Sequence, residues 1–177
     1  MRRKFTTAAV VAGLGLAAAI APPATAASDD TIVTFTIDSG DLTIDAPDAV
    51  DLGTVASDAT SVSGPIGPVT VTDKRGVLNG SWTATAISTD FTTGAATPPE
   101  TIPNINVVYT PGSQNDHTGT GTFTLGPGGI INVPRVAFTG TDLVGNNSAT
   151  WNPSLTITIP DGKVAGIYTG TVTHSVG

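Results

Sequence analysis

Threonine and apolar residues alternate in six stretches of this chain. Successive side chains of a β-strand point to opposite faces, so alternation places the apolar residues on one face and the threonines on the other. A sheet with one buried and one solvated face is typical of antiparallel β-proteins. The stretches are residues 31–37, 69–72, 82–86, 120–125, 155–159 and 168–173.

Glycine and proline clusters separate these stretches, and no part of the chain after residue 28 keeps a helical period. Two of the intervening segments, residues 92–103 and 111–119, are expected to be loops. Many short strands with regular turns predict an all-β fold, an antiparallel β-sandwich of the immunoglobulin-like kind, in a single domain.

The first 27 residues have the organisation of a secretory signal peptide. Basic residues at positions 2–4 precede an apolar run over residues 6–20, and small residues at 24–26 suit a signal peptidase. The apolar run is shorter than the roughly 20 residues that span a bilayer. We therefore expect a mature domain of residues 28–177 without a membrane span, located outside the cell or at its surface.

Charge and composition exclude several functions. The sequence has 7 Lys+Arg, 14 Asp+Glu and no Cys. Beyond residue 27, four basic residues face all 14 acidic ones, so 4 − 14 gives a net charge of −10. Because such a chain cannot neutralise phosphates, nucleic acid is an unsuitable partner. Without cysteine there is no disulfide and no thiolate zinc site.

The residues that catalysis needs are scarce. His117 and His174 are the only histidines, and Glu100 is the only glutamate. No Gly-x-Ser-x-Gly elbow occurs, and neither a Ser-His-Asp triad nor a glycosidase carboxylate pair can be assembled from the sequence. We expect a protein that is not an enzyme and has no cofactor.

Residues 71–76 and 79–84 read VTDKRG and NGSWTA, a charged turn that leads into a tryptophan strand. Residues 155–160 and 165–170 read LTITIP and AGIYTG, and the chain closes with YTGTVTHSV over 168–176. Together these stretches resemble the WxL domain, a secreted surface module of Gram-positive bacteria. The resemblance implies a β-sandwich that binds cell-wall peptidoglycan or a surface partner protein without a covalent bond.

Three positions depart from the WxL pattern. Ala84 stands in place of the leucine of the first motif. His174 and Val176 stand in place of the closing tryptophan and leucine. The resemblance covers roughly residues 32–177.

The two tryptophans are candidates for contact with glycan, because a flat apolar ring can stack on a sugar. Trp82 shares a strand face with Ala84 and Ala86, small neighbours that leave room for an indole, so we expect Trp82 in the core. Trp151, at the start of a predicted strand, is compatible with either a core or a binding position.

Arg75, Tyr168 and His174 complete the set of candidate wall- or ligand-binding residues. Arg75 suits a ligand carboxylate because its guanidinium forms a bidentate fork. Alternatively, the turn at 73–76 is structural, with Asp73 capping it and Gly76 supplying a positive φ. His174, with an ordinary pKa of about 6.5, is expected to gain a positive charge in mild acid.

Acidic residues recur every three or four positions near the start of the predicted domain. Carboxylates at this density are weak candidates for a calcium site, although the usual 12-residue calcium loop is absent. The alternative is a solvated acidic edge that prevents strand-to-strand aggregation. The residues are Asp38, Asp41, Asp45, Asp48 and Asp51.

The sequence thus predicts a secreted, non-catalytic surface module that binds peptidoglycan or a surface partner protein. Two alternatives remain open. One is a structural or adhesive subunit that assembles by strand addition through its threonine-rich edges. The other is a carrier that holds a small molecule in the cleft of the sandwich.

Overall fold

The computed structural model describes residues 25–177, and its compact unit comprises Ile37–Gly177. Residues 25–36 have no regular secondary structure. The predicted signal peptide lies outside the described residues except for its last three positions. Within the described residues, no helix has the length and apolar character needed to cross a membrane.

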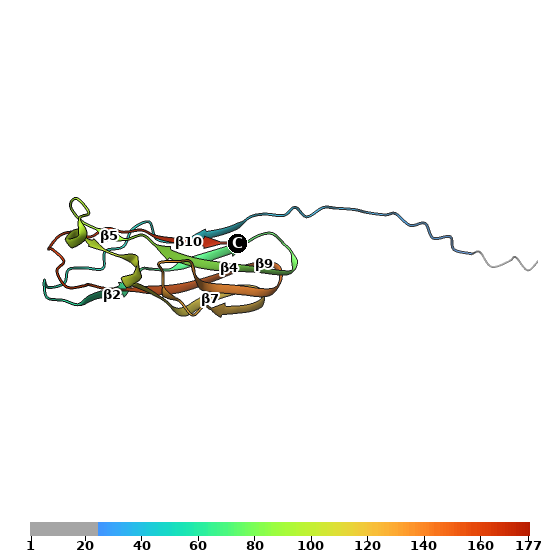
Figure 1. The fold of residues 1–177 in the computed structure, drawn as a ribbon. Coiled ribbons are helices and arrows are strands. Elements are labelled where there is room, and N and C mark those ends of the chain that lie inside the picture. Colours follow the sequence, from blue (N-terminus) through green and yellow to red (C-terminus); the bar gives the residue numbers. More distant parts are fainter. Residues whose placement is uncertain (1–24) are drawn as a thin grey trace, which may run out of the picture. The chain divides into compact units, whose positions relative to one another are not determined.

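The compact unit is almost entirely β-structure, and its strands pair antiparallel (Figure 1). No α-helix occurs in the described part of the chain, which confirms the predicted all-β class. The strands are β1 (Leu42–Asp45), β2 (Ser61–Pro65), β3 (Val69–Asp73), β4 (Leu78–Ser88), β5 (Phe91–Thr92), β6 (Thr101–Ile102), β7 (Val107–Leu125), β8 (Gly129–Ile130), β9 (Arg135–Thr158) and β10 (Val172–Val176), with 3-10 turns η1 (Pro98–Glu100) and η2 (Asn104–Asn106).

The main sheet has the order β1-β3-β9-β4-β10, and its two end strands approach each other without pairing. The sheet therefore curls nearly into a barrel, in keeping with the predicted sandwich. A separate pair, β5 and β6, completes the architecture.

Strand β9 is the centre of this sheet, because β2, β3, β4 and β7 all pair with it. Its first part, 135–144, pairs with β4, and residues 147–151 pair with β3. Asp142, near the end of the first pairing, and Gly145, between the two pairings, have positive φ values of 54° and 70°. The backbone of β9 thus changes direction where it passes from one neighbour to the next.

The prediction of a loop at residues 111–119 is wrong, because these residues lie inside β7. Pro111-Gly112 does not end the strand; the register against β9 shifts between Thr110 and Ser113 instead. Gly112 has a φ of 76°, and a Cβ there would overlap the carbonyl of Asn152. Glycine thus supports an irregularity within the strand rather than a turn.

Most of the alternating stretches form strands as predicted. Residues 69–72 lie in β3, 82–86 in β4 and 120–125 in β7, and 155–158 end β9. Only the last two residues of stretch 168–173 belong to β10. Residues 92–103, predicted to be a loop, also contain the short strands β5 and β6 and the turn η1.

The stretch 31–37 is a second correction, because it belongs to no strand. Residues 33–37 alternate as strictly as β3, but no described strand pairs with the stretch. Alternation predicts which side chains share a face, whereas a strand also needs a neighbour for its main-chain hydrogen bonds.

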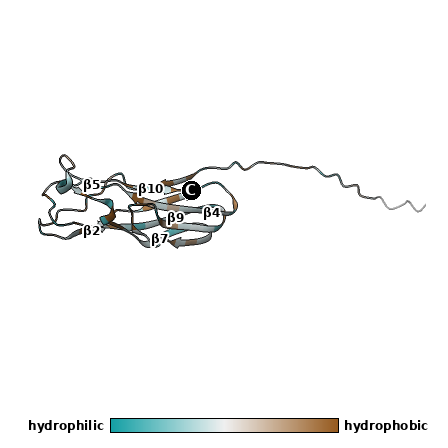
Figure 2. Ribbon diagram, in the orientation of Figure 1, coloured by the Kyte–Doolittle hydropathy of each residue, from teal (hydrophilic) through white to brown (hydrophobic). Residues whose placement is uncertain are grey.

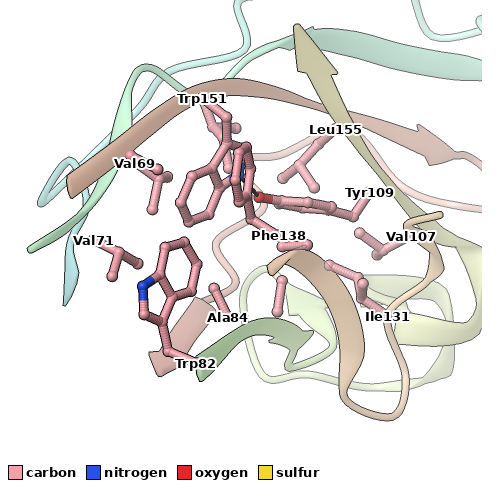
Figure 3. Packing of buried hydrophobic residues seen from close by; sticks show 14 of the residues in the cluster. Val69, Val71, Trp82, Ala84, Val107, Tyr109, Ile131, Phe138, Trp151 and Leu155 are labelled. Atoms are coloured by element: carbon pink, nitrogen blue, oxygen red, sulfur yellow. Dashed lines mark hydrogen bonds between the residues drawn. The ribbon is translucent and has the colours of Figure 1, made fainter. Parts of the chain in front are cut away.

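The core lies between β4, β7 and the two parts of β9 (Figure 3). Phe138 stacks on Trp82 at a ring-centroid distance of 5.8 Å and on Trp151 at 5.1 Å. Trp82, Ala84 and Ala86 are all buried, so the predicted core face of β4 is confirmed. Figure 2 shows hydrophobic and hydrophilic residues intermixed along the strands, as the alternation requires.

Candidate functional site

A chain of buried hydrogen bonds holds Trp82 in place. Its indole N–H donates to Oδ1 of Asn147 over 2.9 Å, and the Asn147 amide nitrogen donates to Oδ2 of Asp73 over 3.1 Å. The Asp73 side chain is fully buried. Arg75 donates to both carboxylate oxygens of Asp73, through Nε and Nη2, over 2.9 Å each.

This arrangement decides between the two interpretations of Arg75. Its guanidinium fork is occupied by Asp73, and Nη2 also donates to the carbonyl of Ser81 over 2.9 Å. The Asp73 carboxylate caps the turn by accepting the Arg75 backbone N–H, and Gly76 has a φ of 65°. The hydrogen bonds from Arg75 lower the pKa of Asp73. Arg75 is therefore a structural residue and not an open fork for a ligand.

Trp151 is buried as well and has a different set of partners. Its indole N–H donates to the Tyr109 hydroxyl over 2.8 Å, and that hydroxyl lies 3.2 Å from Nε2 of His174 (Figure 3 shows the first of these bonds). Both tryptophans thus belong to the core, and neither presents a ring face on which a sugar can stack.

Burial lowers the pKa of His174 to about 4. The expectation that mild acid charges this ring is therefore wrong, because the ring stays neutral in the folded protein down to that pH. A neutral imidazole can accept a hydrogen bond from the Tyr109 hydroxyl. Burial in turn raises the pKa of Tyr109. His174 lies in β10, an end strand of the main sheet order.

Tyr168 fastens the segment that leads into β10. Its hydroxyl lies 2.9 Å from the carbonyl of Val164 and 3.2 Å from that of Pro99. The side chain is half-buried, so part of the ring remains accessible.

The five aspartates from Asp38 to Asp51 are exposed. Asp51 accepts the backbone N–H of Gly53 over 2.8 Å, as in a local turn. Over residues 25–177, no three His, Asp or Glu side chains form a group that could hold a metal ion. The arrangement is that of a solvated acidic edge.

A cleft opens next to Tyr168 and His174, and the sequence did not indicate it. Residues 46–55, which follow β1, form one wall, and residues 166–172, which lead into β10, form the other. Two adjacent hollows of about 190 and 580 Å³, which share Val50, Leu52 and Phe91 in their walls, make up this cleft. Ligand sites in proteins commonly have volumes of roughly 300–1,000 Å³.

The surface of the cleft is polar and apolar in about equal parts, and its aliphatic side chains touch the core. Ile157 and Leu155 of β9 reach its floor, together with Ile102 of β6. Ile167 on one wall has 87% of its surface exposed, and Val50 on the other has 45%. Asp48 and Asp51 also line the cleft and give one wall a negative charge. Such a surface can bury apolar groups away from water.

The wall formed by residues 46–52 also offers main-chain groups. In the described structure no main-chain hydrogen bond joins these residues to another segment. Below this wall, β1 pairs only with β3, and β10 pairs only with β4, among the described strands. The cleft therefore combines apolar side chains with backbone N–H and C=O groups that are open to a partner.

In the sequence, the walls of this cleft contain only isolated aliphatic residues between Gly, Asp and Thr, and these follow no period. No protein-family model matches the chain, and neither a curated protein nor a solved structure matches it. Its function is therefore argued from its own geometry.

Proposed function

We propose that this protein is a secreted, non-catalytic surface module that binds an extended apolar segment of a partner protein in the cleft between residues 46–55 and 166–172. The observation that carries the proposal is the combination of aliphatic side chains and open main-chain groups in one cleft. Extended peptides bind to sheet edges through main-chain hydrogen bonds, while pockets for alternate side chains supply specificity.

The burial of the tryptophans favours a protein partner over peptidoglycan. Trp82 and Trp151 are core residues, and Arg75 is paired with Asp73. Of the five candidate wall-binding residues, Tyr168 and His174 line the cleft. The resemblance to the WxL domain supports a surface location for the module, and wall binding is the competing outcome in the experiment below.

The experiment uses the mature chain, residues 28–177, and a phage-displayed library of unstructured 12-residue peptides. We expect selected peptides to alternate apolar and polar residues. Their binding should be lost in Ile167→Asp and Val50→Asp, because a charge in the cleft opposes burial of an apolar side chain. Both residues are substantially exposed, so the variants should fold.

Two control variants match these in exposure and lie outside the cleft. Leu78→Asp matches Ile167→Asp, with 74% exposure against 87%, and Val133→Asp matches Val50→Asp, with 46% against 45%. Both controls should retain peptide binding. Purified sacculi are tested in parallel. If sacculi bind while no peptide binds in a cleft-dependent manner, the protein is a wall binder and the proposal is wrong.

A further inference from the structure

Residues 31–37 have the character of a β-strand that lacks its sheet. The segment reads TIVTFTI, and every residue in it is β-branched or aromatic, the types that are enriched in strands. Between 81 and 90% of the surface of Ile32, Val33 and Phe35 is exposed, and Ile37 is 84% exposed. So much exposed apolar surface in one short segment marks an interaction site.

The cleft has the complementary properties. It lacks a strand between the wall at 46–52 and the edge of β10, and it has an aliphatic floor. In an extended segment, Val33, Phe35 and Ile37 share one face, about 6.6 Å apart, while Ile32, Thr34 and Thr36 share the other. The first face can enter the cleft while the threonines of the second remain in water.

We propose that residues 31–37 of one copy of this chain add as a strand to the cleft of a second copy. This inference rests on the proposed function and names the partner segment. The segment fits the two requirements of the site, an extended backbone that can pair and alternate apolar side chains that can be buried.

The connection to β1 favours a second copy over the same molecule. The Gly40 N–H donates to the Lys74 carbonyl, and the Lys74 N–H donates to the Asp41 carbonyl, both over 2.9 Å, so the chain is already paired with its neighbour at residue 40. If residues 31–37 folded back along β1 of the same molecule, only Asp38 and Ser39 would remain for the hairpin loop. Two-residue hairpin turns favour Asn-Gly, Asp-Gly or another pair with glycine, and Asp38-Ser39 is not such a pair.

Donation from copy to copy is a head-to-tail contact. Each copy offers one segment and one cleft, so two copies can exchange segments and close as a dimer, and donation in one direction continues as a ladder. We therefore expect oligomers of two or more copies. The segment has no charge of its own, but Asp29, Asp30 and Asp38 flank it and meet Asp48 and Asp51 of the cleft. Salt should strengthen the assembly by screening this repulsion.

The test measures the mass of the mature chain by size-exclusion chromatography with light scattering, over a range of concentrations at low and high salt. We expect oligomers that grow with concentration and with salt. The donor variant Val33→Asp/Phe35→Asp and the cleft variant Ile167→Asp should each lose all species above the monomer. Leu78→Asp and Val133→Asp should assemble like the wild type.

A mixture of the donor and cleft variants gives the sharpest result. The donor variant has an intact cleft and the cleft variant has an intact segment, so the mixture should form a two-copy species and nothing larger. A wild type that stays monomeric throughout, or oligomers that persist in either variant, would overturn the proposal. If the wild type is monomeric and the donor variant gains peptide binding, the segment occupies its own cleft, which also contradicts the proposal.

Failure of this inference and failure of the proposed function are distinguishable. Library peptides that bind in a cleft-dependent manner to a monomeric wild type leave the proposed function standing and reject the second copy as partner. If neither library peptides nor a second copy use the cleft, both are wrong.

Discussion

The two tryptophans are both buried against Phe138, yet their polar ends lead to different surroundings. Trp82 leads through Asn147 to the Asp73–Arg75 ion pair, which closes a tight turn with charge-assisted hydrogen bonds. Trp151 leads through Tyr109 to His174, a neutral ring that lines the cleft. One end of the core is thus fixed by charge, whereas the other ends in uncharged groups beside the cleft.

The comparison shows which of the two hydrogen-bond chains lies beside the cleft. Charge-assisted hydrogen bonds are roughly twice as strong as neutral ones and fix geometry more strictly. β1 and β10 do not pair with each other, and His174, at the end of the neutral chain of hydrogen bonds, lines the cleft beside them.

The largest expected effect concerns the buried indole ring that each side of the core contains. Trp82→Ala and Trp151→Ala should each lower the free energy of unfolding by about 3–5 kcal/mol, the usual loss for a buried aromatic ring. Urea unfolding followed by circular dichroism measures the loss, and Leu78→Ala, at an exposed position, is the control. A loss below about 1 kcal/mol at either tryptophan would remove that residue from the core and restore it as a glycan contact.

An intermediate effect tests the charged side alone. Asp73→Asn should lower the free energy of unfolding by about 2–3 kcal/mol, because hydrogen bonds to a charged group lose their charge assistance. The pKa of Asp73 is lower in the folded protein than its ordinary value of 3.8. Its contribution is therefore complete above that value and is lost as the pH falls through the lowered pKa.

Wild type should lose stability as the pH falls below 3.8, because the Asp73 carboxylate becomes protonated. Asp73→Asn should not show this part of the loss. Thermal unfolding from pH 7 to pH 2 measures it, with Asp45→Asn, at an exposed position, as the control. Equal acid sensitivity of Asp73→Asn and wild type would show that the ion pair does not distinguish the two sides.

The effect that is smallest at neutral pH tests the uncharged side. The unfolded chain takes up a proton on His174 near pH 6.5, whereas the folded protein takes it up only near pH 4. The unfolded state thus binds more protons in this window, so the stability of wild type should decline as the pH falls from 6.5 to 4. His174→Gln should lack this decline, and thermal unfolding across the window measures the difference.

Two further variants sharpen this result. Tyr109→Phe removes the hydroxyl between Trp151 and His174 and should cost about 1–2 kcal/mol at all pH values. His117→Gln removes the other histidine and should retain the decline caused by His174. If His174→Gln keeps the decline, the ring at the cleft is not the group responsible.

Much of the core was predictable from local spacing. Trp82, Ala84 and Ala86 share a strand face whatever the neighbouring strands are, and Asp73 and Gly76 form their turn within four residues. The partner of Asp73 and Trp82 was not predictable in this way. Asn147 lies 74 residues from Asp73, and nothing in its local sequence distinguishes it from its neighbour Asn146.

The candidate site was harder to predict for a physical reason. Its walls, residues 46–55 and 166–172, are irregular segments without a period, and the cleft exists only because β1 and β10 come together in space. Conversely, the alternation at 31–37 predicted a strand that the compact unit does not contain. A pattern in the chain describes a face of a strand and does not say in which molecule that strand finds its neighbours.

The central position of β9 has a consequence for how the chain folds. β2, β3, β4 and β7 all pair with residues 135–158, which follow all four strands in the sequence. None of these pairings can form until β9 has been synthesised. Pairing between such distant segments is slow, with folding times on the order of milliseconds to seconds. The order of the strands itself thus delays completion of the sheet until residues 135–158 are available.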